Sequence, residues 1–287
     1  MAGRPPRVAG RRMTARARRP EAGRGPAVFV MIPTYNESNN LPTLIESIDA
    51  LKIPRLSIVV VDDNSPDGTG KLADRLARTR PHLHVVHRLH ERGRGTAGIA
   101  GFKASLAKGA DLIVEMDADF SHHPRHLPDL IAAAREADVV VGSRFVAGGR
   151  DLNRGWLRHG ITRLANFYIR RILGLRQVHD CTSGYRLFHR RVLEAVKMDN
   201  TVSLGPSIVQ ELLYKALLLG FTVREIPIVF KDREQGKSTF SWRIMIQSFL
   251  MTLIIKFLFS SLRRVEIHPG EPTGPKNGPR SRRRIKK

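Results

Sequence analysis

The amino-acid sequence predicts an α/β fold built on a mostly parallel sheet. The first half of the chain alternates short apolar runs, rich in Val, Ile and Leu, with segments of helical periodicity. Continuous apolar strands joined by helical crossovers are typical of a parallel sheet covered by helices on both faces. A chain of 287 residues with 41% hydrophobic residues can bury a substantial core. We therefore predict one globular domain over residues 27–240.

The apolar spacing assigns the individual elements in order. The predicted strands of the first half are 27–32, 56–63, 82–88, 111–117 and 138–145. The predicted helices between them are 41–51, 69–80, 96–108 and 126–136. The second half is less regular, and there we predict a helix at 156–173, a strand and a helix within 183–196, a helix at 206–220, a strand at 221–230 and a helix at 241–262.

The net charge of +23 is concentrated at the two ends of the chain. Residues 1–26 carry eight Arg and one Glu, and residues 263–287 carry nine Lys or Arg and two Glu, so each end has a net charge of +7. These ends are rich in Gly, Pro and Arg, and we predict two disordered basic tails. Such tails suit an anionic membrane surface or RNA about equally well. The remaining residues lack the interleaved basic and aromatic side chains that stack bases, so we expect no specific nucleic-acid partner.

Two features bear on the cellular compartment. The single cysteine, Cys181, excludes an intramolecular disulfide and a thiolate metal cluster. The Arg-rich start of the chain has no apolar secretory segment, and Met13 is an alternative to Met1 as the first residue. We expect the domain to face the cytosol.

The apolar segment 241–262 has three interpretations. Its apolar stretch of 19 residues, 244–262, is barely long enough to cross a bilayer, and Gln247 and Lys256 interrupt it. A helix in the membrane surface, amphipathic or re-entrant, is the interpretation that we favour. A single membrane span and a soluble core helix are the alternatives.

Polar motifs follow four of the predicted strands. They read "PTYNE", "DDNSPDGT", "DADFSHHP" and "GSR". Ligands of open α/β sheets bind beyond the carboxyl ends of the strands, so we expect these motifs to line one crevice.

Asp117 and Asp119 form a D-x-D motif at the end of a predicted strand. Mg²⁺ and Mn²⁺ prefer oxygen ligands, and Mg²⁺ usually takes only one or two protein carboxylates. Alone, the motif is equally typical of a solvated acidic turn. Because Asp62, Asp63 and Asp67 follow a neighbouring strand, the cluster favours a metal site over such a turn.

Three further features are weaker. A ring and a carboxylate at Tyr35 and Glu37 suit a planar ligand such as a nucleoside, although this segment is also typical of a helix cap. The Gly-rich "GRGTAG" (93–98) would bring backbone N–H groups near an anion, but it lacks the lysine of a P-loop. We interpret His122 as a structural or substrate-orienting residue rather than a metal ligand.

Together these motifs resemble one family. "IPTYNE", "VVVDDNSPDGT", "GRGTAGIAG", "MDADFSHHP", "GSRF", "CTSGYRLF" and "VFKDREQGKS" have the order and spacing of family 2 inverting glycosyltransferases, over about residues 27–242. Within that family they are most similar to the polyprenol-phosphate (dolichol-phosphate) mannose synthases, through "DADFSHHP" and "SPDGT". The resemblance implies a GT-A, Rossmann-like fold that binds a nucleotide sugar.

The resemblance also implies roles for individual residues. The nucleoside of GDP-mannose would be held by Pro33, Tyr35, Glu37, Val61 and Asp63. Its diphosphate would be held through Mg²⁺ or Mn²⁺ by Asp117, Ala118 and Asp119, with Ser121 as a further metal ligand. The phosphates of donor and acceptor would be met by Arg144 and Arg233, assisted by Arg158 and Lys237. Asp117, Asp119, Arg144 and Arg233 would be the catalytic residues.

The chain departs from its relatives at two positions. Some relatives have Gln where this chain has Ser121, so a water would fill the gap between the shorter side chain and the metal. Relatives read G-x-S-K where this chain has Gly236 followed by Lys237, a serine and Thr239. In an extended backbone Lys237 and Thr239 face the same way, so Lys237 would supply the missing cation. A solvated loop lysine is the alternative.

The implied reaction transfers mannose from GDP-mannose to a polyprenyl monophosphate with inversion. The acceptor phosphate is already anionic at pH 7, so the reaction needs cations that bring two anions together more than it needs a strong base. We expect the protein at the cytoplasmic face of a membrane, peripheral or anchored through its C-terminal helix, with a membrane-subunit partner compatible with this arrangement. The alternatives are UDP-glucose or another donor on the same fold, and a basic RNA-binding protein.

Overall fold

The computed structural model describes residues 25–90, 93–152, 155–203, 205–231 and 242–260. Its strands are β1 (Val28–Thr34), β2 (Leu56–Asp62), β3 (Leu83–His87), β4 (Leu112–Glu115), β5 (Val139–Ser143), β6 (Arg150–Leu152), β7 (Arg186–His189), β8 (Val223–Pro227) and β9 (Val229–Lys231). Its α-helices are α1 (Leu41–Asp49), α2 (Thr69–Ala77), α3 (Arg94–Ala107), α4 (Leu127–Ala133), α5 (Trp156–Leu173), α6 (Arg190–Ala195), α7 (Ile208–Leu218) and α8 (Trp242–Phe259). Two short 3₁₀ helices are Pro124–His126 and Met198–Asn200.

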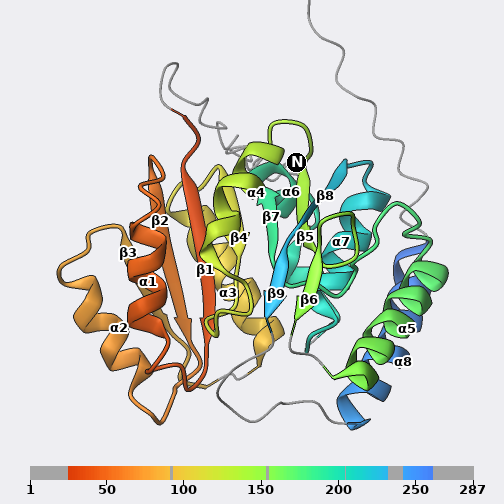
Figure 1. Cartoon of the computed structure of the whole chain (residues 1–287), viewed down its shortest axis with the longest axis horizontal. Coiled ribbons are helices and arrows are strands. Elements are labelled where there is room, and N and C mark those ends of the chain that lie inside the picture. Colours follow the sequence, from red (N-terminus) through yellow and green to blue (C-terminus); the bar gives the residue numbers. More distant parts are fainter. Residues whose placement is uncertain (1–24, 91–92, 153–154, 204, 232–241, 261–287) are drawn as a thin grey trace, which may run out of the picture.

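Seven strands form the central sheet, in the order β3-β2-β1-β4-β7-β5-β8 (Figure 1). β1 pairs in parallel with β2 and β4, β2 with β3, and β5 with β8. β7 runs antiparallel to both of its neighbours, β4 and β5. The prediction of a mostly parallel α/β sheet is confirmed, with β7 as its antiparallel member.

The segment 221–230, predicted as one strand, is two strands in different sheets. β8 pairs with β5 up to Pro227, and β9 pairs with β6 in a separate two-stranded parallel sheet. Between them, the N–H of Ile228 donates to the carbonyl of Ser143 at 3.0 Å, and the carbonyl of Ile228 accepts from Arg150 at 2.9 Å. Ile228 therefore joins the end of β5 to the second sheet, close to the motif that follows β5.

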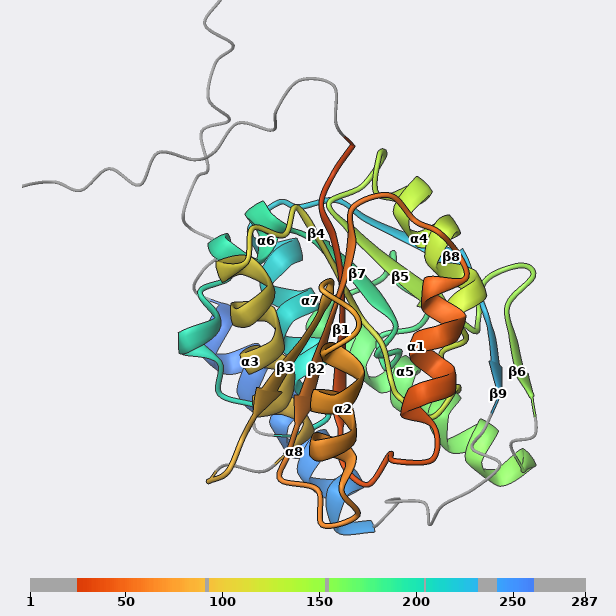
Figure 2. The same cartoon turned by 90° about the vertical axis from the view of Figure 1, so that its left-hand side faces the viewer.

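Helices cover both faces of the central sheet (Figure 2). α1, α2 and α4 lie on one face, and α3, α6 and α7 lie on the other. Successive side chains of β1 serve both layers: Val28, Val30 and Ile32 pack with α1 and α4, whereas Phe29 and Met31 pack with α3 and α7. Because successive side chains point to opposite faces and both faces are buried, β1 is a continuous apolar run in the sequence.

α8 lies within the predicted apolar helix 241–262 and packs against α5 and α7 (Figure 1). Thr252 is buried and donates to Gln210 of α7 at 3.2 Å, and the ring of Phe249 stacks on Tyr168 of α5 at 3.9 Å. Among the described helices, none combines the length and the hydrophobicity that a membrane crossing requires. The predicted basic tails, apart from residues 25 and 26, lie outside the described residues.

Candidate active site

The loops that follow β1 and β2 are joined by hydrogen bonds. The backbone N–H groups of residues 36–38 donate, in order, to the side chains of Ser65, Thr69 and Asp67 at 3.1, 2.9 and 3.0 Å. α1 begins at Leu41, three residues after Ser38, and Asn40 occupies its N-cap position, so the alternative interpretation of this segment as a helix cap through Asn36 and Ser38 is wrong. The motifs "PTYNE" and "DDNSPDGT" therefore form one polar edge, as expected from parallel strands.

The acids that follow β2 bind residues of the loops around them. Asp62 accepts from the Ser65 hydroxyl at 2.6 Å. Asp63 pairs with the buried guanidinium of Arg88 and accepts from the N–H of Gly93 at 2.9 Å. In the part of the chain that the structure describes, no group of three or more His, Cys, Asp or Glu is placed to hold a metal. Because Asp62 and Asp63 bind neighbouring loop residues, the case for a metal rests on the D-x-D motif.

The D-x-D loop directly follows β4. The Asp117 carboxylate accepts from Arg94 at 2.5 Å, and Oδ1 of Asp119 accepts from the N–H of Ser121 at 3.1 Å. Phe120, which lies between Asp119 and Ser121, has a φ of 60°, in the left-handed region that bulky residues rarely adopt. This turn places Ser121 against Asp119 and leaves Ala118 and Ser121 buried. Two carboxylates and a hydroxyl from one short loop make an oxygen-only donor set, which suits a hard divalent cation.

His122 is hydrogen-bonded to the backbone of the D-x-D loop. Its Nδ1 accepts from the backbone N–H of Asp117 at 3.1 Å, and its ring stacks on Tyr185 at 5.0 Å. Burial lowers the pKa of His122, although Asp117 opposes this shift. A neutral imidazole that accepts at Nδ1 carries its proton on Nε2. These contacts agree with a structural role for His122.

Arg94 and Glu115 are residues of this site that the sequence analysis did not single out. Arg94 is the basic residue of "GRGTAG", and Asp117 beside it raises the pKa of its guanidinium despite burial. Burial raises the pKa of Glu115 to about 7, although Arg94 acts in the opposite direction. The sequence does contain a signal for Arg94, because it is the single cationic residue of the Gly-rich motif 93–98. The structure shows that it faces Asp117, which follows a strand. The sequence predicts that backbone N–H groups, rather than this side chain, are the polar groups that the Gly-rich turn offers.

The residues assigned to the nucleoside differ in accessibility. Tyr35 is exposed, and Pro33 and Glu37 are partly buried. Val61 is 0% exposed, and its side chain packs beneath α3, so it does not face a ligand here. Val61 could therefore contact a nucleoside only through its backbone. Its carbonyl already accepts a hydrogen bond from the Thr34 hydroxyl at 3.2 Å.

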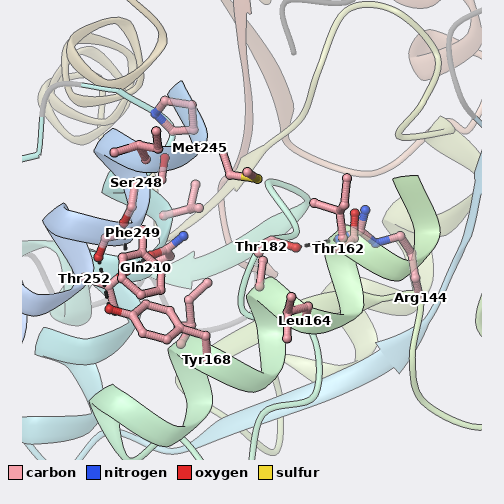
Figure 3. A pocket seen from close by; sticks show the side chains of 16 residues that line it. Arg144, Thr162, Leu164, Tyr168, Thr182, Gln210, Met245, Ser248, Phe249 and Thr252 are labelled. Atoms are coloured by element: carbon pink, nitrogen blue, oxygen red, sulfur yellow. Dashed lines mark hydrogen bonds between the residues drawn. The ribbon is translucent and has the colours of Figure 1, made fainter. Parts of the chain in front are cut away.

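Arg144, the first residue after β5, lies at one end of an apolar cavity of about 560 Å³ between α5, α7 and α8 (Figure 3). Phe249 and Thr252 lie at the other end. Apolar lining residues include Ile161, Leu164, Val209 and Met245. Arg144 is predicted to meet a phosphate, and a guanidinium usually does so through two parallel N–H groups. Instead, its Nε and Nη2 donate to Asp180 at 2.7 and 2.8 Å, so that edge is occupied.

Three other predicted phosphate ligands are placed less closely. Arg158 lies on the first turns of α5 and is partly buried. Arg233 and Lys237 lie outside the described residues, so their roles stay predictions.

Comparison with known proteins identifies the family of this chain. A family model described as Glycosyl transferase family 2 matches residues 29–197. Polyprenol monophosphomannose synthase of Mycolicibacterium smegmatis is 44% identical over 74% of this chain and 80% of its own length. Undecaprenyl-phosphate mannosyltransferase of Micrococcus luteus is 43% identical over 76% of this chain and 89% of its own length.

Solved structures share the fold at lower identity. Glucosyl-3-phosphoglycerate synthase from Mycobacterium tuberculosis, in complex with Mn²⁺, UDP and phosphoglyceric acid, superposes with a TM-score of 0.60 at 19% identity over 83% of this chain and 79% of that chain. Mannosyltransferase PcManGT from Pyrobaculum calidifontis, in complex with GDP-Man and Mn²⁺, superposes with a TM-score of 0.56 at 21% identity over 83% of this chain and 65% of that chain. The expected GT-A-like α/β fold is confirmed.

Proposed function

We propose that this chain, which belongs to glycosyl transferase family 2, transfers mannose from GDP-mannose to a polyprenyl monophosphate with inversion. A phosphate oxygen of the acceptor would attack the anomeric carbon as the bond from that carbon to the nucleoside diphosphate breaks. The product would be a polyprenyl phosphate β-mannose and GDP. The curated relatives named above support both the sugar and the lipid acceptor.

The donor side rests on the loops after β1, β2 and β4. Tyr35 and Glu37 would contact the nucleoside, while Asp117, Asp119 and Ser121 would hold Mg²⁺ or Mn²⁺. When bound, the ion would neutralise the diphosphate and stabilise the leaving group. The oxygen-only donor set of the D-x-D loop fits such an ion. The solved relative with GDP-Man and Mn²⁺ supports the same pairing of donor and metal.

The observation that carries the acceptor assignment is the apolar cavity that ends at Arg144. A polyprenyl phosphate is an apolar chain with an anionic head, and this cavity offers apolar walls with a buried cation at one end. Burial by itself would lower the pKa of Arg144, but Asp180 raises it, so the guanidinium is charged at pH 7. A water-soluble acceptor has no need of such walls.

We also place the protein at the cytoplasmic face of a membrane. α5 and α8 lie side by side and expose large apolar side chains: Trp156, Leu157, Leu164, Phe167, Ile246, Phe249, Leu250, Leu253, Ile254, Phe257 and Leu258. An apolar face of this kind, in a chain that also carries basic sequence at its ends, is typical of proteins that bind the surface of an anionic bilayer. The lipid acceptor would then reach the cavity from the bilayer.

Donor screening with the full-length protein tests this function. Purified protein, Mn²⁺ and a short polyprenyl phosphate would be supplied with GDP-mannose, UDP-glucose or UDP-galactose, and the lipid product would be identified by mass spectrometry. We expect turnover with GDP-mannose and little with the UDP-sugars. Turnover with UDP-glucose alone would replace the donor but keep the acceptor. Sugar transfer to a water-soluble acceptor but not to polyprenyl phosphate would refute the proposal.

A further inference from the structure

The carboxylate of Asp180 binds Arg144 from two sides. Its Oδ2 accepts from the backbone N–H of Arg144 at 3.1 Å and from Nε at 2.7 Å, and its Oδ1 accepts from Nη2 at 2.8 Å. Oδ1 also accepts from Thr182 and from the N–H of Ser183, each at 3.1 Å. Asp180 is 0% exposed. Bidentate, charge-assisted contacts of this kind fix a guanidinium in both position and orientation.

Thr182 completes the support of Arg144. Its hydroxyl accepts from Nη2 of Arg144 at 2.7 Å and from Asn166 at 3.1 Å, and it donates to Asp180 at 3.1 Å. A hydroxyl has one proton and two lone pairs, so all of its hydrogen-bonding capacity is used. Asn166 belongs to α5 and also accepts from the N–H of Cys181 at 2.7 Å. The support of Arg144 is therefore tied to the helix that lines the cavity.

These contacts determine which part of Arg144 can meet a ligand. Asp180 and Thr182 occupy Nε and Nη2, and the planar group is flanked by the rings of Phe145 and Phe230, at 5.2 and 5.1 Å from its central carbon. Nη1 is the nitrogen of Arg144 for which the described residues provide no hydrogen bond. Arg144 itself lines the cavity.

We propose that Asp180 is a positioning residue for phosphate transfer: with Thr182, it holds Arg144 so that Nη1 is the group that Arg144 presents to the phosphate of the lipid acceptor. This inference rests on the proposed function. By charge alone, the carboxylate of Asp180 would weaken the attraction of Arg144 for an anion. Positioning Arg144 gives this carboxylate a favourable role. Because Asp180 and Thr182 already hold the side chain of Arg144 in one orientation, the entropic cost of ordering it is not added when the acceptor binds.

Steady-state kinetics of four full-length variants test the inference. Asp180→Asn keeps the size of the side chain but removes its charge, and we expect the acceptor KM to rise roughly 10- to 100-fold. Thr182→Val keeps the shape and removes the hydroxyl, and we expect a smaller, roughly fivefold rise. Neither variant should change the KM for GDP-mannose. The third variant, Arg144→Ala, should raise the acceptor KM at least as much as Asp180→Asn.

The fourth variant is a matched control at the opposite end of β5. Asp138 pairs with Arg191 at 2.5 Å and accepts from the N–H and hydroxyl of Thr222 at 2.8 and 2.7 Å. Asp138→Asn also removes a carboxylate that is bonded to an arginine, but far along the strand from Arg144. We expect it to lower the melting temperature without changing either KM, which separates loss of stability from loss of positioning.

A double variant shows whether Asp180 acts through Arg144. If it does, adding Asp180→Asn to Arg144→Ala raises the acceptor KM no further. Should Asp180→Asn fail to fold, the same test is made with Thr182→Val, by comparing the acceptor KM of Arg144→Ala with that of the double variant Arg144→Ala and Thr182→Val. The inference is overturned if Arg144→Ala raises the acceptor KM while Asp180→Asn and Thr182→Val behave like Asp138→Asn. If Arg144→Ala itself leaves the acceptor KM unchanged, the proposed acceptor role of Arg144 fails and the inference falls with it.

Discussion

Asp119 is the residue on which we expect turnover to depend most strongly. It lies in the turn made by the left-handed Phe120, and Asp119→Ala removes one of the two carboxylates of the D-x-D loop. Because a catalytic cation supplies several kcal/mol of charge stabilisation, we expect turnover to fall about 10³-fold or more. The measurement is GDP-mannose turnover with Mn²⁺ and after addition of EDTA. Asp49→Asn, on the surface beside Arg80, is the control that should keep full activity. Full turnover of the wild-type protein in EDTA would show that no metal is needed.

The reactivity of the Cys181 thiol is a second test at a single residue, because it depends on the burial of this side chain. Burial raises the pKa of its thiol to about 12, from an ordinary value of 9.0. Only the thiolate reacts with disulfide reagents, so at pH 8 the native protein should not be labelled, whereas the unfolded chain should react at one thiol. Because the folded state holds this proton more tightly, the associated stability is complete below pH 9 and is lost as the pH rises towards 12. Rapid labelling in native buffer would contradict the buried position of Cys181.

Among the helices, α8 offers a test of membrane binding. Thr252 and Ile255 bury one side of this helix, whereas Phe257 is 83% exposed and Leu250 52% exposed. We expect the double variant Leu250→Ser and Phe257→Ser to keep its melting temperature within a degree or two and to bind lipid vesicles several-fold more weakly, since the loss concerns exposed apolar area. Sedimentation with vesicles measures this. Leu89→Ser, which changes a leucine that is 63% exposed and lies after β3, away from α5 and α8 (Figure 1), should bind as the wild-type protein does.

The packing of α3 on the sheet gives a second test at this scale. A Cβ atom at Gly101 would lie 2.1 Å from Cγ of Met31 and 3.0 Å from Val61, so α3 approaches β1 and β2 more closely than any other residue allows. We expect Gly101→Ala to destabilise the fold by about 1–3 kcal/mol through overpacking. Gly160, inside α5, has nothing within 4 Å of its Cβ position. Gly160→Ala should therefore stabilise by about 0.5–1 kcal/mol, and equal effects in thermal unfolding would refute the packing argument.

For the whole molecule, the distribution of charge separates the enzyme from the RNA-binding alternative. The two ends of the chain supply +14 of the +23. Each Lys or Arg near an anionic membrane is worth about 1 kcal/mol, so a variant limited to residues 25–262 should bind anionic vesicles more weakly at low salt. It should keep its affinity for GDP-mannose and lose most of its affinity for RNA, both measured by titration. Retained RNA affinity together with lost donor affinity would favour the RNA-binding alternative.

The sequence by itself determined the layered α/β fold and the edge at which the site forms. Apolar runs such as 27–32 and 58–61 are buried on both faces, and because their pattern is local it can be recognised without a structure. The carboxyl ends of parallel strands then meet at one edge. Asp117 and Asp119 could be placed there for the same reason, since each motif directly follows its strand.

Only the tertiary structure decided which groups pair across that edge. Asp180 lies 36 residues from Arg144, and antiparallel β7 enters between β4 and β5; neither contact leaves a periodic signal in the chain. Asp63, which reads as a ligand-binding acid, is neutralised by Arg88 from the next strand end. α8, which reads as a membrane helix, buries Ile255 against the domain and exposes its other side. Local periodicity specifies which face of an element is apolar, but packing between distant segments decides which partner covers that face and which charges remain for a substrate.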